Sequence, residues 1–465
     1  MSYAFTFDAS ACSGCKACQE ACKDKNGLPV GILWRRVIEV AGGEWQTNGD
    51  AWENSIFAYN LSITCNHCTH PKCAGVCPVD AYTVRPDGIV LLDASKCMGC
   101  GYCAWACPYS APQYDMSRGI MTKCDFCYDN LDAGIPPTCV SACPLRVLDY
   151  TSLEDVKTIK GGQYLWQLPA TEHPFPLPSF SRTEPHLVIK PHMGMKYPLE
   201  KIVSNREEIL PPGSIENDHR TAAIHELPLV GFTLLTQMAA GMAVCGLLIS
   251  SLPASALLAI GILLAAGGLS SFLHLGRKRN AWRSATHLRK SWLSREILMT
   301  GLFAIAWAVA AGTELLGVAS PNPWPLAILG LVLIYSMSRV YRLRAVPSWN
   351  TWRTPAAFYL SVIVLGVLGM RLFMPLPGWE YVAGLALAAE LSLSLTTKPA
   401  MIGAIRTIRI ALLGLGVLGT LLMAVIPQVS GGWLSSLVFL IALAAEAMGR
   451  WQFYAERVPF PLRPN

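Results

Sequence analysis

Eight apolar segments fill the second half of the chain, and short polar loops separate them. Each segment has about the 20 residues that an α-helix needs to cross the hydrocarbon core of a bilayer. One such segment could be a buried helix of a soluble protein, but eight in succession favour a membrane bundle. The predicted spans are residues 229–251, 254–275, 295–317, 324–343, 356–375, 379–397, 406–427 and 433–454.

The first half of the chain is dominated by cysteine. Sixteen of the 17 cysteines lie before residue 144. They form four quartets. Two of these have the C-x2-C-x2-C-x3-C spacing of bacterial ferredoxins, one widens a single gap to four residues, and one widens it to eleven. In chain order the quartets are Cys12, Cys15, Cys18 and Cys22; Cys65, Cys68, Cys73 and Cys77; Cys97, Cys100, Cys103 and Cys107; Cys124, Cys127, Cys139 and Cys143.

This spacing is typical of ligands to cubane iron–sulfur clusters. Three cysteines on a tight loop reach three corners of one cluster, and the fourth ligates a neighbouring cluster. Four structural zinc sites are an alternative, but zinc ribbons present two separated C-x2-C pairs rather than runs of four. The N-terminus shows no export signal, so a disulfide framework is not favoured. Spacing alone lets the second quartet exchange its last cysteine with either the third or the first.

Three runs carry a family resemblance: CNHCTHPKCAGVCPVDAY (65–82), DGIVLLDASKCMGCGYCAWACPYSAPQYD (87–115) and MTKCDFCYDNLDAGIPPTCVSACPLRVLDY (121–150). They resemble the iron–sulfur subunit of dimethyl sulfoxide reductase and its relatives, the four-cluster subunits of membrane-bound molybdopterin oxidoreductases. The resemblance covers nearly all of residues 1–150. It implies an α+β ferredoxin-like double 2x[4Fe–4S] domain in which the first quartet pairs with the fourth and the second with the third.

Every ligand position is cysteine, so the resemblance implies four [4Fe–4S] clusters rather than a three-iron variant. The implied ligand sets are Cys12, Cys15, Cys18 and Cys143; Cys124, Cys127, Cys139 and Cys22; Cys65, Cys68, Cys73 and Cys107; Cys97, Cys100, Cys103 and Cys77. Nearby cations could tune the cluster potentials. The candidates are Lys16, Lys72, Lys96 and Lys123.

The loops between the predicted spans carry their basic residues on one side. The second, fourth and sixth loops and the C-terminal tail hold seventeen lysines and arginines, whereas the opposite loops hold only Arg371. The positive-inside rule places the basic side in the cytoplasm. Because the number of spans is even, the N-terminal half is expected there too. The net charge of +6 is modest, and no nucleic-acid partner is expected.

Three further runs resemble the eight-helix membrane anchor of the same family: HLGRKRNAWRSATHLRKSWLSREI (274–297), RVYRLRAVPSWNTWRTP (339–355) and EAMGRWQFY (446–454). That anchor is normally a separate chain, so this sequence is interpreted as a natural fusion. The resemblance implies exchange of electrons with menaquinone or ubiquinone and no haem. The residues agree, because a buried haem needs histidines on facing helices and only His274 lies within a predicted span.

His274 and Glu296 are the candidate residues for quinone chemistry. Quinol oxidation releases two protons with two electrons, and a histidine or a buried glutamate can accept them. The resemblance carries this role onto both through the HLG and LSRE motifs. The turn at residues 277–279 (RKR) is more basic than relatives often have, which puts the direction of electron flow in question.

Two further carboxylates lie within predicted spans, where ionisable side chains are functional candidates by default. Glu446 can pair with Arg450 one turn on, which favours a structural role. Glu390 has no partner that the sequence identifies. Cys245 is expected to be a small packing residue.

The sequence therefore predicts a cluster domain at 1–150, an extended wrapping segment at 151–227 and an all-α bundle of eight spans at 228–465. The expected function is electron transfer between the membrane quinone pool and a separate molybdopterin catalytic subunit. A cytoplasm-facing sulfite:quinone oxidoreductase in the inner membrane is favoured by the loop charges. A quinol-oxidising reductase of dimethyl sulfoxide type is the alternative, and a non-redox assembly anchor is an alternative of another class.

Overall fold

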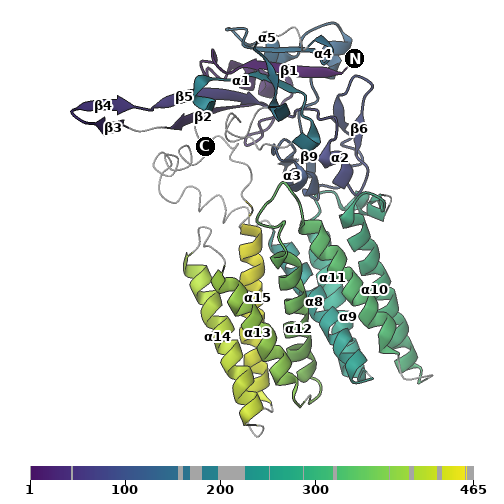
Figure 1. Ribbon diagram of the computed structural model, residues 1–465. Coiled ribbons are helices and arrows are strands. Elements are labelled where there is room, and N and C mark those ends of the chain that lie inside the picture. Colours follow the sequence, from purple (N-terminus) through teal and green to yellow (C-terminus); the bar gives the residue numbers. More distant parts are fainter. Residues whose placement is uncertain are drawn as a thin grey trace. The chain divides into compact units, whose positions relative to one another are not determined.

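The computed structural model describes residues 2–42, 45–155, 161–167, 181–196, 226–250, 252–285, 287–317, 322–375, 377–396, 403–426, 432–455 and 457. The polypeptide forms two compact units. The first contains Met1–Ile215, Arg279–Arg283 and Val458–Asn465, and the second contains Glu216–Lys278 and Ser284–Arg457. The first unit mixes strands with short helices, and the second is helical (Figure 1). This confirms the predicted fold class.

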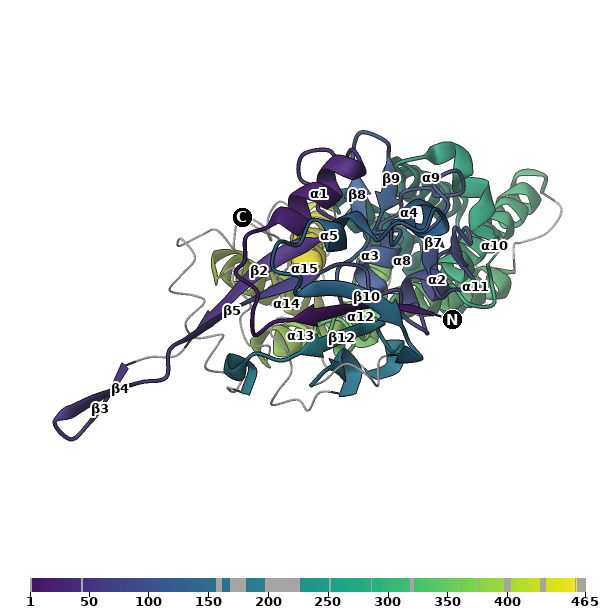
Figure 2. The same ribbon diagram turned by 90° about the horizontal axis from the view of Figure 1, so that it is seen from above.

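The first unit is built on a four-stranded sheet in the order β10-β1-β12-β11. β1 (Tyr3–Asp8) is antiparallel to β10 (Leu148–Ser152) and parallel to β12 (Leu187–Lys190), which pairs with β11 (Gln163–Tyr164). Figure 2 shows β10, β1 and β12 side by side. The strand that precedes the first cysteine quartet therefore pairs with the strand that follows the fourth.

Two-stranded ribbons and short helices complete this unit. The ribbons are β2 (Arg36–Gly42) with β5 (Phe57–Ile63), β3 (Trp45–Asn48) with β4 (Ala51–Asn54), β6 (Tyr82–Val84) with β7 (Val90–Leu92), and β8 (Gln113–Asp115) with β9 (Ile120–Thr122). The helices are α1 (Ala17–Lys25), α2 (Lys72–Val76), α3 (Tyr102–Ala106), α4 (Tyr128–Asp132) and α5 (Thr138–Ser141), with 3-10 turns η2 (Leu165–Gln167), η3 (Ser181–Thr183) and η4 (Met193–Lys196). Many of the cysteines belong to the unit's hydrophobic core.

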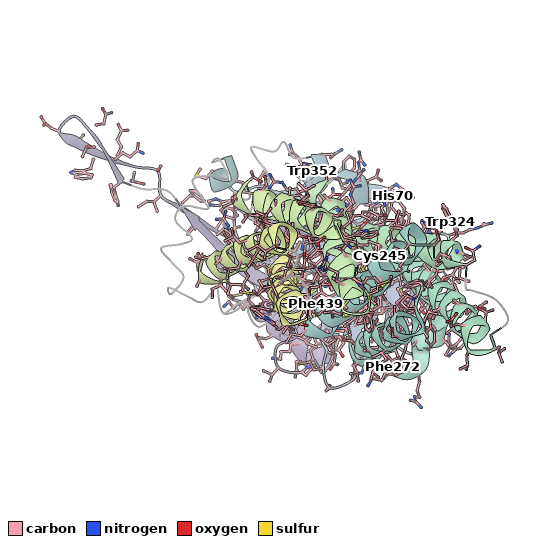
Figure 3. All side chains as sticks on the ribbon, turned by 90° about the horizontal axis from the view of Figure 1, so that it is seen from below. His70, Cys245, Phe272, Trp324, Trp352 and Phe439 are labelled. Atoms are coloured by element: carbon pink, nitrogen blue, oxygen red, sulfur yellow. The ribbon has the colours of Figure 1, made fainter. Side chains whose placement is uncertain are left out.

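The described part of the second unit forms eight long helices. They are α8 (Leu227–Leu248), α9 (Ala254–Leu273), α10 (Trp292–Leu315), α11 (Pro323–Tyr341), α12 (Arg353–Arg371), α13 (Trp379–Thr396), α14 (Gly403–Val425) and α15 (Trp433–Ala455). The 3-10 segment η5 (Lys278–Ala285) follows α9 in the sequence, and most of it belongs to the first unit. α8 packs against α9, α11, α12 and α15. Cys245 on this helix lies inside the bundle (Figure 3) and is buried, as a packing residue would be.

Seven of these eight helices are long and apolar enough to cross a membrane. The eighth, α13, is not among the seven and carries two buried carboxylates, Glu380 and Glu390. Several of the arginines counted as loop charges lie within helices; they are Arg295, Arg339, Arg353, Arg406, Arg409 and Arg450. Arg409 belongs to α14, and Arg450 is buried in α15. Arg450 is enclosed in the unit and Arg409 is mostly covered beside Glu390, so these two contribute little to the loop bias that the sequence predicts.

α8 and α12 come into contact through glycine. A methyl group at Gly241 would collide with the carbonyl oxygen of Val362 and with the backbone of Gly366. Small residues permit such close approach of backbones, which is how helices without a hydrophobic driving force associate in lipid. The close contact holds Gln237 and Ser361, which lie on these two helices, near each other.

Candidate functional site

Two antiparallel pairings bring the cysteine quartets together. The end of β1 pairs with the start of β10, so the first quartet begins at the place where the fourth ends. In the β6–β7 hairpin, Tyr82 pairs with Leu92. Cys77 comes five residues before this pair and Cys97 five residues after it. The sheet register therefore places the first quartet beside the fourth and the second beside the third.

The sulfur atoms lie in four groups, each with three cysteines of one quartet and the last cysteine of its neighbour. One cavity with about 330 Å³ of empty volume is lined by Cys12, Cys15, Cys18 and Cys143. Another, of about 380 Å³, is lined by Cys65, Cys68, Cys73 and Cys107. In the other two groups, electrostatic interactions connect Cys22 with Cys124, Cys127 and Cys139, and Cys77 with Cys97, Cys100 and Cys103.

The four C-x2-C loops share a backbone feature. The residue before the second cysteine has a positive φ in each: 71° at Gly14, 43° at His67, 72° at Gly99 and 64° at Phe126. This conformation turns successive N–H groups toward one centre. The amides of Gly99 and Phe126 lie 3.4 and 3.3 Å from the sulfurs of Cys97 and Cys124. Such N–H donors stabilise negative charge on cluster sulfurs.

Two of these positions are not glycine, so packing must hold the strained backbone. The rings of His67 and Phe126 meet edge to face, with centroids 5.2 Å apart, and both side chains are 1% exposed. The Phe126 ring also stacks on Phe5 of β1 at 4.0 Å. The same aromatic contact therefore fixes the C-x2-C loops of the second and fourth quartets.

Burial keeps the free thiols in their protonated form. Burial raises the pKa of Cys22 and of Cys100 to about 12, and that of Cys107 to about 11. Without metal these thiols would be protonated at neutral pH, and metal binding would displace the protons. Soft sulfur donors in groups of four around a cavity fit iron–sulfur clusters, which when bound accept and donate single electrons.

Arg35 lies beside these groups, although it is far from them in the cysteine pattern of the sequence. Its side chain is 2% exposed and interacts electrostatically with Cys18, Cys22, Cys124 and Cys139. Nη1 donates to Ser62 Oγ at 3.1 Å, and the guanidinium lies 4.4 Å from the centroid of the Phe5 ring. One buried cation thus lies beside two of the four cysteine groups.

Arg36 is a second buried cation, and it lies beside a third cysteine group. It is buried beside Cys65 and Cys107, and Nη2 donates to the Tyr109 carbonyl at 3.0 Å. Burial lowers the pKa of Arg36 to about 10. The only sequence signal for both arginines is the WRRV motif that leads into β2.

The four candidate lysines differ in their placement. Lys123 is buried and donates to the carbonyls of Val90 and Cys124. Lys16 and Lys72 are exposed, and Lys96 is partly exposed beside Asp93. Of these four, only Lys123 therefore has the burial that makes a charge effective at a cluster.

In the helical unit, the two quinone-site candidates lie near a pair of tyrosines. His274 ends α9, and its Nε2 is 3.7 Å from Oε2 of Glu226. Glu296 on α10 is 3% exposed, and within the described residues its Oε1 has no hydrogen-bond partner. Tyr454 interacts electrostatically with both Glu226 and Glu296, and its hydroxyl is 2.6 Å from that of Tyr341. No local sequence pattern singles out Glu226 or either tyrosine for this role.

The two mid-span carboxylates have partners that the sequence did not show. Glu390, for which no partner was identified, lies 3.3 Å from Nη2 of Arg409 on α14. Glu446 accepts a hydrogen bond from Ser361 at 2.7 Å, and Ser361 in turn accepts one from Arg450 at 3.4 Å. The pairing expected between Glu446 and Arg450 is therefore made through a serine of another helix.

Comparison with known proteins relates each half of this protein to a different protein family. Residues 56–153 match the family model described as a 4Fe-4S dicluster domain, and residues 221–397 match that of the DMSO reductase anchor subunit. Over 194 residues, 42% of its length, this protein is 46% identical to the B subunit of the anaerobic dimethyl sulfoxide reductase of Escherichia coli, covering 91% of that subunit. The corresponding subunit of Haemophilus influenzae is 45% identical over 191 residues, which is 41% of this protein and 89% of that subunit.

A formate dehydrogenase iron-sulfur subunit from Wolinella succinogenes is 38% identical over 166 residues, which is 31% of this protein and 78% of that subunit. The N-terminal half thus matches separate iron–sulfur subunits over most of their length, and the C-terminal half matches an anchor subunit. The protein therefore belongs to the family of dimethyl sulfoxide reductase iron–sulfur subunits, and is a fusion of such a subunit with the DMSO reductase anchor into one multi-pass electron-transfer and membrane-anchor protein.

Proposed function

We propose that this protein relays electrons between the membrane quinone pool and a separate molybdopterin catalytic subunit, through four [4Fe–4S] clusters. The nested grouping of the sixteen cysteines supports the ligand sets that the resemblance implies. Residues 1–150 would hold the clusters, 151–227 would link, and 228–465 would anchor the protein and bind quinone. The named functions of the matched relatives support a molybdopterin partner.

One observation in the membrane half carries the quinone proposal. Glu296 is buried with an unpaired oxygen among the described residues, beside the Tyr341–Tyr454 pair, and Glu226 connects the same neighbourhood to His274. Buried polar atoms are normally paired, so this oxygen is available to a ligand or to ordered water. A quinone that gains two electrons also takes up two protons, and Glu296 and His274 can supply them at its two oxygens.

Two complexes fit this role. The matched relatives named for dimethyl sulfoxide reductase favour a quinol-oxidising reductase. The basic loops favour a sulfite:quinone oxidoreductase whose cluster domain faces the cytoplasm. An assembly anchor without redox function is disfavoured, because the sixteen cysteines have no missing member.

Changing Glu296 to Gln tests the quinone site. The clusters of the purified complex are reduced with dithionite, the excess is removed, and decylubiquinone is added. We expect reoxidation to slow by about tenfold or more, because the glutamine cannot deliver a proton, while the electron paramagnetic resonance (EPR) spectrum of the clusters is unchanged. Glu314→Gln, on the same helix at its other end, is the control. A wild-type rate in Glu296→Gln would show that the site lies elsewhere.

Orientation distinguishes the two complexes. A fluorescent protein fused to the C-terminus should fluoresce, and alkaline phosphatase fused at the same place should be inactive, if the basic side faces the cytoplasm. The reverse pair of results would place the cluster domain outside the cell. It would then favour the dimethyl sulfoxide type of reductase.

A further inference from the structure

A buried series of polar side chains extends from the quinone-site candidates into the middle of the helical unit, and the proposed function does not use it. At one end lie Tyr341 and Tyr454, which interact electrostatically with Glu296 and with Arg450. Arg450 lies one turn before Tyr454 on α15. Its Nη2 donates to Gln237 Oε1 of α8 at 3.0 Å.

The series continues through α12 to a pair of carboxyl groups. Nη2 of Arg450 also donates to Ser361 at 3.4 Å, and Ser361 donates to Glu446 Oε2 at 2.7 Å. The carboxyl of Glu390, on α13, lies within hydrogen-bonding distance of that of Glu446. Two carboxyl groups can share a hydrogen bond only when one of them carries a proton. A proton held between the two carboxyl groups would relieve the repulsion between them.

Two nitrogen atoms along the series are buried without a partner in the described part of the protein. They are Nε2 of Gln237 and Nε of Arg450, on side chains that are at most 5% exposed. Buried polar groups left unpaired by protein atoms are typically satisfied by ordered water. Water between them would join the hydroxyl, amide and carboxyl groups into one hydrogen-bonded series.

Arg409 gives the carboxyl pair a connection to the surface of the unit. Its guanidinium is 3.3 Å from Glu390, and its side chain is 18% exposed, whereas that of Glu390 is 1% exposed. The charged groups that face the pair are Arg409 on α14 and Arg450 on α15. Two cations beside two carboxyls allow either a shared proton or a fully ionised pair without a large net charge.

We propose that this series is a proton-transfer path inside the anchor, in which protons pass through water between Glu296, the hydroxyls of Tyr341, Tyr454 and Ser361, and the Glu446–Glu390 pair. Arg450 stays a cation throughout and orients Ser361 and Gln237. The inference rests on the proposed quinone site at Glu296. When a quinone takes two electrons from two reduced clusters and becomes quinol, the two protons that it needs come through this path. When a quinol is oxidised, the same path carries two protons away and two electrons enter the clusters.

A structural ion pair elsewhere in the unit provides a contrast. Arg371 and Glu380 form a buried pair with Nη1 2.9 Å from Oε1, where α12 ends and α13 begins, away from Ser361 and Glu390 in the interiors of these helices. This pair joins one cation directly to one anion across two neighbouring helices. Glu380→Gln is therefore the matched control for a buried glutamate that only holds helices together.

The test uses the purified complex of the full-length protein with its catalytic subunit, and decylubiquinone as the probe. Reoxidation of dithionite-reduced clusters is followed in ordinary and in heavy water. Glu446→Gln should lower the maximal rate by about tenfold and enlarge the solvent isotope effect, because proton delivery becomes limiting. The half-saturating quinone concentration should stay near that of the wild type. Glu446→Asp should recover most of the rate, and Glu380→Gln should stay within about twofold of it.

Two results would overturn the path. One is a Glu446→Gln rate within about twofold of wild type. The other is a slower rate with an unchanged isotope effect that Glu380→Gln reproduces, which would indicate a structural role. If Glu446→Gln fails to assemble, Ser361→Ala removes the same connection with a smaller change and must show the same slowing and isotope effect. Loss of the path alone leaves the Glu296→Gln phenotype intact, whereas a wrong quinone site abolishes that phenotype.

Discussion

Changing Cys107 to Ala should destroy the cluster bound by the second quartet and leave the third quartet's own cluster intact. Cys107 follows the third quartet's helix, yet its sulfur lines the cavity of Cys65, Cys68 and Cys73. A cubane that loses one of four thiolates loses an iron or fails to assemble. In EPR of the fully reduced protein, each remaining [4Fe–4S] cluster contributes one unpaired spin. The spin count should therefore fall from about four to about three.

Double variants make the pairing unambiguous. Cys107→Ala with Cys68→Ala removes two ligands of one nested group, so the count should stay at about three. Cys107→Ala with Cys100→Ala removes ligands of two different groups, so it should fall to about two. If each quartet instead holds its own cluster, these two outcomes exchange. That exchange would refute the nested ligand sets.

Changing Arg35 to Gln should lower the midpoint potential of the cluster bound by Cys22, Cys124, Cys127 and Cys139. Three of these four cysteines interact electrostatically with the Arg35 guanidinium. Reduction adds one negative charge to the cluster, and a nearby cation stabilises that charge. At ~8 Å and an effective dielectric constant of ~20, one charge contributes about 2 kcal/mol, or about 90 mV for one electron. Redox titration followed by EPR measures the shift.

Two controls separate the charge of Arg35 from its packing against Phe5. Arg35→Lys keeps the cation and should leave most of the potential unchanged. Lys16→Gln removes an exposed cation beside the first quartet and should shift the potentials by less than about 20 mV, because solvent screens it. A shift in Arg35→Gln no larger than that of Lys16→Gln would contradict tuning by this arginine.

The sequence was sufficient for the features that a local pattern encodes. Four cysteine quartets predicted the thiol groups, and eight apolar runs of about span length predicted the eight helices. Glycine before the second cysteine at Gly14 and Gly99 marked two of the four left-handed turns. His67 and Phe126 occupy the other two, and no local rule identifies them, because their strained backbone is held by rings from different parts of the sequence.

The sequence was insufficient where distant segments meet. Arg35 reaches Ser62 only because β2 pairs with β5, so its position beside the cysteines depends on strand register. Likewise Arg409 and Glu390 are 19 residues apart on antiparallel neighbours and meet only when α13 packs on α14. Arg409 and Arg450 lie near the ends of predicted spans, so the sequence alone does not distinguish them from loop charges.

The pairing of β1 with β10 determines the order in which parts of this protein can assemble during synthesis. A ribosome synthesises the polypeptide from its N-terminus. All eight cysteines of the second and third quartets, which form two of the ligand groups, are therefore present once Cys107 is added. The groups that combine the first and fourth wait for Cys143, and β1 waits for β10, which begins at Leu148. All of this precedes α8, which begins at Leu227. The two clusters of the second and third quartets can thus form before the two of the first and fourth, and all four can form before the first span is made. The fusion also attaches one set of clusters to every anchor.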